Sequence, residues 1–338
     1  MKAVGYHKSL PIAERDSLVD FVADQPKPSE RDLLVAVKAV SVNPVDTKVR
    51  MRAAPNPGEP PKVLGYDAAG TVEAVGPEVT LFKPGDDVFY AGSIARPGTN
   101  AEFHLVDERI VGSKPNSLSF SQAAALPHTS ITAWELLFDR LAVRPGKTPD
   151  GRALLILGGA GGVGSIMIQL ARRLTALTVI ATTSRDETRA WCRKLGTHHV
   201  IDHSMPLAAQ LKAIGHAEVA LIAGITGTDQ HYPVVPEIIA PQGKFALIDD
   251  PKEIDVKLLK RKAASLHWES MFTRAIFQTP DMVAQHYLLN EVAAMVDEGL
   301  IVTTMAKEMT PINAANLRAA HAQIESGTTI GKVVLSGW

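Results

Sequence analysis

A single carboxylate lies in the apolar, glycine-rich first half of the segment VLGYDAAGTVEAVG, which spans residues 63–76. Asp67 follows Tyr66 and precedes two alanines. A carboxylate among such neighbours usually costs several kcal/mol unless a partner compensates it. Asp67 could therefore be a metal ligand, a catalytic acid, or a polar group hydrogen-bonded into the frame of a site.

A glycine-rich turn offers a second kind of chemistry. The segment LLILGGAGGVGS contains Gly159, Gly161 and Gly164 in the spacing GxGxxG, between an apolar strand and a helix. In such a turn the first glycine permits the tight bend, the second admits a pyrophosphate, and the third allows close helix–strand packing. Free N–H groups at the start of the helix, around Gly162 and Val163, favour phosphate. The pattern predicts a dinucleotide site.

The end of the next strand bears on which dinucleotide binds. An NAD site places an acidic residue there, about 20 residues after the turn, to hold the ribose 2′-hydroxyl. Here the strand ends in IATTSRDE, so that neutral Ser184 and cationic Arg185 occupy the position. Guanidinium matches phosphate geometry, which predicts NADPH. Ser184 and Glu187 also fit a capping box for the following helix, and Asp186 is an alternative ribose ligand.

The chain has one cysteine, Cys192, which excludes an internal disulfide and any multi-cysteine zinc site. Cys192 falls in a segment predicted to be helical, where we interpret it as a small packing residue. The net charge is −1, from 35 basic and 36 acidic residues. No basic run suggests nucleic acid or an anionic membrane as a partner. The N-terminal residues lack the apolar core of a secretory signal, so we expect a cytoplasmic protein with no membrane segment.

The elements that must position these residues fall into two groups. Residues up to about 120 contain short runs bounded by glycine and proline, typical of a small, irregular, mostly antiparallel barrel. Ser119 or Ser121 is a candidate cap for the helix that follows. From residue 153 onward strands alternate with helices, which predicts a parallel doubly wound α/β sheet. Beyond Pro280 come two amphipathic helices and a final strand, GKVVL.

Five segments in this order resemble the medium-chain dehydrogenase/reductase superfamily: VSVNPVDTKVR, VLGYDAAGTVEAVG, FKPGDDVF, AAALPHTSITAWELL and GGAGGVGSIMIQLA. Within it the chain is most similar to the quinone oxidoreductase-like branch, often labelled zinc-type alcohol dehydrogenase-like. The resemblance covers nearly the whole chain. It implies a GroES-like β-rich catalytic domain (1–125 and 280–338) and a Rossmann NADP-binding domain with a parallel sheet (126–279), with the active site in the cleft between them.

The resemblance also implies roles for individual residues. Asn43, Tyr66 and His128 stand where zinc-dependent members carry metal ligands, and neutral Asn and Tyr are poor zinc ligands. We therefore expect no metal. Asp67 matches a carboxylate that lies behind the metal in the family, which implies a buried structural role with a basic partner from the cofactor domain. Lys48 replaces the tyrosine of the quinone oxidoreductase branch, and is either a catalytic cation or a solvated loop lysine.

These expectations describe an NADP-dependent oxidoreductase that transfers a hydride to a quinone or an α,β-unsaturated carbonyl without catalytic zinc. The candidate catalytic residues are Asn43, Lys48, Tyr66 and His128. One alternative is a zinc-dependent or simple-carbonyl alcohol dehydrogenase/reductase. Another is a non-catalytic NADPH-binding sensor or structural protein. The segment ASLHWESMF is a candidate edge strand, which in relatives pairs across a two-fold axis, so we also expect a homodimer.

Overall fold

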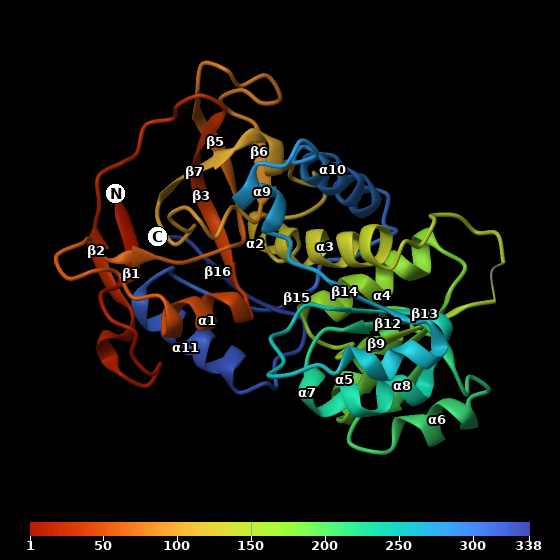
Figure 1. Cartoon of the computed structure of the whole chain (residues 1–338). Helices are drawn as coiled ribbons and strands as arrows, with labels where there is room; N and C mark the ends of the chain where they lie inside the picture. The colour runs from red at the N-terminus through yellow and green to blue at the C-terminus, as the bar shows by residue number, and fades with distance from the viewer. Residues whose placement is uncertain (150) are drawn as a thin grey trace. The chain divides into compact units, whose positions relative to one another are not determined.

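The computed structural model describes residues 1–149 and 151–338 (Figure 1). These residues form two compact units. The first unit combines both ends of the chain, residues Met1–Ile131 and Phe272–Trp338, and the second unit is Thr132–Met271. The domain boundaries expected from the sequence stay a prediction.

The second unit is built on a six-stranded parallel sheet with the strand order β11-β10-β9-β12-β13-β14. The strands are β9 (Ala153–Leu157), β10 (Thr178–Thr183), β11 (His199–Asp202), β12 (Val219–Gly224), β13 (Ile239–Leu247) and β14 (Ser265–Trp268). The order reverses direction between β9 and β12, as in doubly wound folds. The predicted fold class is confirmed, and the segment expected to form an edge strand is β14.

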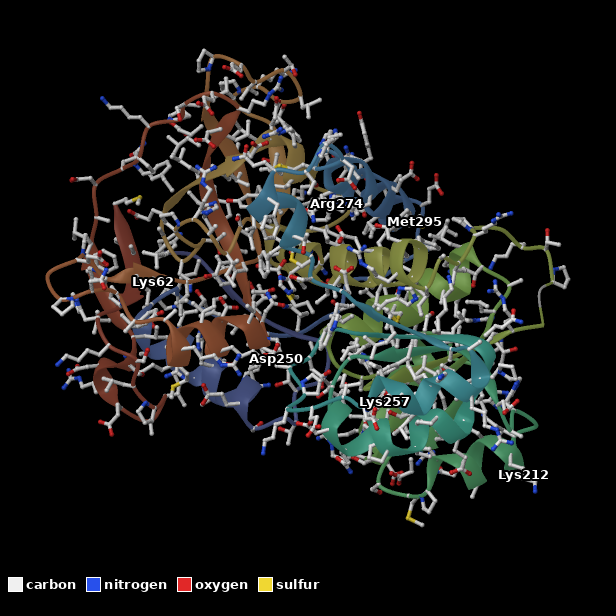
Figure 2. The ribbon with its side chains drawn as sticks, in the orientation of Figure 1. Lys62, Lys212, Asp250, Lys257, Arg274 and Met295 are labelled. Carbon is white, nitrogen blue, oxygen red and sulfur yellow. The ribbon has the colours of Figure 1, made fainter. Side chains whose placement is uncertain are left out.

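Helices connect these parallel strands. They are α4 (Gly162–Leu174), α5 (Asp186–Lys194), α6 (Leu207–Ala213), α7 (Thr228–His231) and α8 (Val235–Ile238), with η4 (Tyr232–Val234) between the last two. A π-helical segment, η3 (Glu135–Arg140), precedes the sheet, and η5 (Val256–Lys262) lies between β13 and β14. The buried core of the sheet is aliphatic and aromatic, and includes Leu155, Ile180, Ile222 and Phe245. Charged side chains such as Lys212 and Lys257 project outward (Figure 2).

The first unit is mostly antiparallel. Its larger sheet has the order β15-β16-β3-β5-β6-β8, with β7 also paired to β3. The strands are β3 (Asp32–Val42), β5 (Ala68–Val75), β6 (Asp87–Tyr90), β7 (Phe103–Asp107), β8 (Val111–Ser113), β15 (Met305–Met309) and β16 (Lys332–Ser336). A smaller sheet has the order β2-β1-β4, from β1 (Lys2–Tyr6), β2 (Val19–Val22) and β4 (Lys62–Val63). The long strand β3 has irregular register with β5, so that it can bend between its partners.

The helices of the first unit are α1 (Pro44–Arg52), α2 (Phe120–Ala124), α9 (Thr273–Phe277), α10 (Ala284–Asp297) and α11 (Ala314–Glu325). Helix α3 (Pro127–Trp134) begins in this unit, and short 3-10 turns are η1 (Arg15–Ser17) and η2 (Glu108–Ile110). The expected cap of α2 is Ser119, whose Oγ accepts from the Gln122 N–H at 3.2 Å. Among the described residues, no helix combines the length and apolar character that crossing a membrane demands.

Candidate active site and nucleotide site

Asp67 is fully buried and is hydrogen-bonded through both carboxylate oxygens. Its Oδ2 accepts from Ser41 Oγ and Asn43 Nδ2, each at 2.9 Å. Its Oδ1 accepts from the backbone N–H of His128 at 2.8 Å. The carboxylate therefore ties the end of β3 to the first turn of α3. This dense set of donors supports the structural role expected from the sequence.

A buried ammonium group completes the surroundings of Asp67. Lys332 is only 3% exposed, and its Nζ lies 3.1 Å from Asp67 Oδ2. The same Nζ donates to the Val42 carbonyl at 3.0 Å and to Asn43 Oδ1. Burial lowers the pKa of Lys332, while the Asp67 carboxylate raises it. The basic partner thus exists, but it comes from β16 of the first unit and not from the cofactor domain, as the sequence had led us to expect.

Strand pairing explains how Lys332 reaches this place. Strand β16 runs antiparallel to β3, with Val333 opposite Val42, so Lys332 lies level with Asn43. The local sequence hints at a buried Lys332 only because this lysine directly precedes the apolar residues Val333–Leu335, which are fully buried in the structure. A cation next to buried strand residues needs a buried anion, but the sequence does not indicate which one.

A second buried carboxylate, Asp46, holds the segment that carries Asn43. Asp46 Oδ2 accepts from the Asn43 N–H at 2.7 Å, and Oδ1 accepts from the Gly65 N–H at 3.0 Å. Gly65 has φ +111, and a Cβ there would lie 2.4 Å from Thr99 Oγ1, so only glycine fits. Burial raises the pKa of Asp46 to about 7, against the lowering effects of its N–H partners and of Lys332. No sequence motif had predicted a role for Asp46.

Tyr66 and His128 are brought together by a third ring. Phe272 lies edge-on to Tyr66, with ring centroids 5.5 Å apart, and to His128 at 5.4 Å. Tyr66 is 1% exposed, and its buried Oη has no hydrogen-bond partner among the described residues. Burial raises the pKa of Tyr66 well above its usual range, so the phenol stays protonated and can donate. Burial lowers the pKa of His128 to about 4, with Asp67 opposing, so its imidazole is neutral near pH 7.

Asn43 and Lys48 belong to the same local segment. Asn43 is the N-cap of α1 and is buried, whereas Lys48 lies further along α1 and is partly exposed. Of the four candidate catalytic residues, Asn43 is part of the Asp67–Lys332 cluster, His128 joins it through its backbone N–H, and Tyr66 precedes Asp67 in the chain. The catalytic roles of all four stay predictions.

The glycine turn lies between β9 and α4, as predicted. The position of the bend and the role of Gly159 differ from those expected. The left-handed bend is made by Gly158, with φ +95, and not by Gly159. A Cβ on Gly159 would lie 2.7 Å from Ala181 Cβ and 3.1 Å from Cys192 Sγ, so Gly159 is required for packing. Cys192 is buried and its pKa is raised to about 12 by burial, which agrees with a packing role.

The remaining glycines differ in how closely their neighbours approach, and the cofactor-binding roles predicted for the turn stay predictions. A Cβ on Gly164 would lie 2.3 Å from the Gly158 carbonyl oxygen, so helix and turn pack too closely for any side chain. Gly161 is the N-cap of α4, and a Cβ there would meet no atom nearer than 4.0 Å. Gly162 and Val163 begin the helix and are partly exposed. The open side at Gly161 is where a pyrophosphate could approach the helix N-terminus.

The end of β10 differs from its predicted local structure. The N-cap of α5 is Arg185, whose backbone N–H donates to Thr188 Oγ1 at 3.3 Å. The capping box expected from Ser184 and Glu187 is therefore wrong by one residue. Glu187 instead forms an ion pair with the Arg185 guanidinium. Both side chains are well exposed, so the pair is weak and can rearrange when a ligand arrives.

The chain is similar to known proteins over nearly its whole length. Residues 29–133 match the alcohol dehydrogenase GroES-like domain family, and residues 195–335 match the zinc-binding dehydrogenase family. A zinc-type alcohol dehydrogenase-like protein of Staphylococcus aureus (strain COL) is 40% identical, over 99% of this chain and 100% of the relative. The chain belongs to the medium-chain dehydrogenase/reductase superfamily. This membership confirms the resemblance drawn from the sequence motifs, and makes the protein an oxidoreductase of that superfamily.

Solved structures match this medium-chain dehydrogenase/reductase over its whole length. A zinc-dependent alcohol dehydrogenase-type protein from Rhizobium etli CFN 42 is 60% identical, with a TM-score of 0.96, over 100% of this chain and 98% of that chain. The quinone oxidoreductase from Coxiella burnetii is 25% identical, with a TM-score of 0.81, over 100% and 99%. The chain is therefore similar both to a protein named as an alcohol dehydrogenase and to a quinone oxidoreductase.

Proposed function

We propose that this medium-chain dehydrogenase/reductase is an NADPH-dependent reductase of quinones or α,β-unsaturated carbonyls that works without catalytic zinc. The observation that carries the proposal is the Lys332 ammonium, bonded to Asn43 Oδ1 and lying 3.1 Å from Asp67 Oδ2. A protein cation already neutralises the carboxylate and occupies the amide oxygen at the place where zinc-dependent relatives assemble ligands.

The donor set does not fit zinc. Catalytic zinc uses thiolate, imidazole or carboxylate donors, usually three from the protein. Asn43 offers only an amide whose oxygen and nitrogen are both bonded, and Tyr66 offers a protonated phenol. His128 is the remaining imidazole. In the described part of the chain, no three His, Cys, Asp or Glu side chains gather where they could share a metal ion.

The glycine turn does fit a dinucleotide. Gly161, Gly162 and Val163 present the open start of α4, which suits a pyrophosphate. Ser184 and Arg185 at the end of β10 suit a 2′-phosphate, and hence NADPH over NADH. When bound, a nicotinamide supplies the hydride, and the protein supplies orientation and electrostatics.

The residues of the first unit suit an acceptor whose negative charge becomes delocalised. Tyr66 Oη, which has no hydrogen-bond partner among the residues that the structure describes, can donate to a carbonyl oxygen, and this would account for an otherwise costly buried hydroxyl. One neutral donor is modest help compared with a metal ion. A single hydrogen bond suits an enolate or a hydroquinone anion, whose charge is delocalised, better than it suits a simple alkoxide. The Lys48 cation could add a proton or hold the nicotinamide ribose.

A substrate screen tests this proposal. Purified enzyme is supplied with NADPH and, in separate reactions, a benzoquinone, an enone, an alkenal and a saturated aldehyde. We expect steady NADPH consumption with the first three and little with the saturated aldehyde. Preferential turnover of the saturated aldehyde would support a simple-carbonyl reductase instead. NADPH binding with no turnover of any acceptor would support a non-catalytic binding protein.

The homodimer also belongs to this proposal. Strand β14 pairs with β13 and is the last strand of its sheet, and Trp268 on it is 56% exposed. An open strand edge with a large exposed aromatic residue favours pairing with a second copy. Light scattering at micromolar concentration should give the mass of a dimer, and a monomer mass would contradict the proposal.

A further inference from the structure

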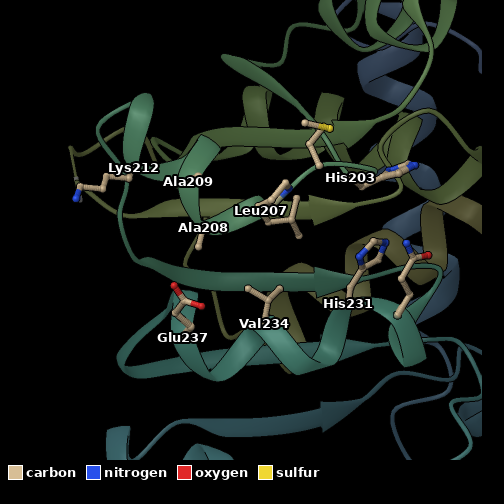
Figure 3. A pocket seen from close by; sticks show the side chains of 11 residues that line it. His203, Leu207, Ala208, Ala209, Lys212, His231, Val234 and Glu237 are labelled. Atoms are coloured by element: carbon tan, nitrogen blue, oxygen red, sulfur yellow. The ribbon is translucent and has the colours of Figure 1, made fainter.

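The second unit contains a cavity of about 570 Å³. It lies between α6 and the segment from α7 to α8, and Figure 3 shows His203 and His231 together at one end, with Lys212 and Glu237 at the other. Leu207 and Val234 line its middle. The two imidazoles give this end of the cavity a polar character that depends on pH.

His203 is held at the carboxyl edge of the sheet, beside the end of β10. Thr183 pairs with Asp202 in parallel register, and the His203 N–H donates to the Thr183 carbonyl at 3.3 Å. His203 is therefore level with Ser184, one strand away. This is the edge at which the second strand of a dinucleotide fold meets the ribose 2′ substituent.

The imidazole of His203 is also linked to the glycine turn. Its Nδ1 lies 3.1 Å from Thr182 Oγ1, and that oxygen accepts from the Gly158 N–H at 3.1 Å. The threonine thus fixes the ring through one nitrogen. Within the described residues no hydrogen bond engages the other nitrogen, Nε2, and the side chain is only partly buried. A ligand can therefore reach Nε2.

A second imidazole lies beside the first. The rings of His203 and His231 have centroids 5.7 Å apart. Burial lowers the pKa of both, and each is further adjusted by charges nearby: Asp202 raises the pKa of His203, while His203 lowers and Asp249 raises that of His231. The other charged groups around them are Arg189, which acts on Asp202, and Lys212 and Glu237 at the far end of the cavity. A dianion arriving beside these rings favours their protonated forms.

We propose that His203 binds the 2′-phosphate of NADPH by taking up a proton from the solvent, which makes the preference for NADPH over NADH pH-dependent. This inference rests on the proposed cofactor. The Arg185 guanidinium is already paired with Glu187, which partly neutralises the charge that it offers to a phosphate. A neutral imidazole that becomes cationic only when phosphate arrives adds a charge-assisted hydrogen bond that NADH cannot elicit.

Titration calorimetry at pH 7.5, in buffers of different ionisation enthalpy, measures the proton uptake directly. We expect roughly 0.5 to 1 proton taken up per NADPH bound, and close to none per NADH. Protonation of the phosphate itself does not mimic this result, because a phosphate with a pKa near 6 that meets cations tends to release protons. Equal proton uptake for NADPH and NADH would overturn the inference, even if NADPH binds tightly.

Variants assign the effect to a residue. In the wild type, the ratio of the NADH to the NADPH Kd should fall about tenfold from pH 6.5 to 8.5, the size of one charge-assisted hydrogen bond. His203→Gln should flatten this dependence, while the matched control His216→Gln, outside the cavity, should keep it. A flat wild-type ratio, or an unchanged slope in His203→Gln, would overturn the inference but leave the proposed reaction standing. Failure of either cofactor to bind the wild type would overturn both.

Discussion

Asp67 and Arg185 are both charged side chains close to a predicted site, but their surroundings differ. Asp67 is fully buried and receives hydrogen bonds from three donors besides the Lys332 ammonium. Arg185 has a side chain that is 40% exposed, and its ion-pair partner Glu187 is also exposed. Removing the charged partner of Asp67 leaves a buried ion unpaired. At Arg185, water can replace the lost partner. The two regions should therefore respond to substitution in different ways, one through folding and the other through binding.

The largest effect should follow from removing the buried cation. Lys332→Met leaves the Asp67 carboxylate without its counterion, which should cost about 3–5 kcal/mol of unfolding free energy. Urea denaturation measures this loss, with Lys38→Met as the control, because Lys38 is exposed on β3. The control should stay within about 0.5 kcal/mol of the wild type. A loss below about 1 kcal/mol in Lys332→Met would show that the cluster is not held by this pair.

Lys48 lies between the two cases, on a helix whose N-cap is buried but with a side chain that is itself partly exposed. If its charge assists the acceptor, Lys48→Met should lower kcat/KM about 10²-fold, as expected for a lost acid–base group, with folding unchanged. The effect should shrink for highly activated quinones, which need little acid assistance. Stopped-flow hydride transfer with a benzoquinone and a plain enone provides the comparison. Rates within about twofold of the wild type for both acceptors would identify Lys48 as a solvated lysine.

Burial in the first unit should also appear in the pH dependence of stability. His321 is fully buried, and burial together with the Arg50 cation lowers its pKa to about 3. An unfolded histidine binds a proton near pH 6.5, so stability present above that pH is lost as the pH falls toward 3. His321→Leu removes this linkage and should lessen the loss between pH 8 and pH 5 by about 2 kcal/mol. An unchanged pH profile in urea denaturation would show that His321 does not contribute.

The smallest of these effects is expected at the exposed site. Arg185→Ala should weaken NADPH binding roughly tenfold and leave NADH unchanged, because only NADPH carries the phosphate that the guanidinium can bind. Glu187→Gln is the matched variant, since it releases Arg185 from its ion pair and should strengthen NADPH binding slightly. Calorimetry measures the affinity of each variant for both cofactors. Equal losses of affinity for NADPH and NADH would show that Arg185 does not discriminate between them.

The parts of the fold that depend on local patterns could be predicted from the sequence. The glycine turn, the Ser119 cap and the alternation of strands and helices each reside within a few residues, and all are present in the structure. The finer local chemistry was less predictable. The bend falls on Gly158 and the helix cap on Arg185, each one residue from the expected place, because neighbouring glycines or polar residues satisfy the same pattern.

The candidate site was predictable only in part because its central contacts join distant segments. The partner of Asp67 is Lys332, which reaches it through the antiparallel pairing of β16 with β3. Phe272 lies against Tyr66 and His128 from a segment that carries no motif. His203 depends on the register of β11 beside β10. Strand pairing between remote segments is set by the whole fold, so no spacing in the sequence reveals it.

The proposed reaction needs no zinc, because the Lys332 ammonium already neutralises Asp67 and binds the Asn43 amide oxygen. The most direct test measures zinc and activity in the same sample. Enzyme that has been dialysed against a chelator and checked by elemental analysis is assayed for NADPH oxidation with a benzoquinone. We expect well under one zinc per chain and full activity. About one zinc per chain, removed by the chelator together with the activity and restored with it, would contradict a zinc-independent reaction.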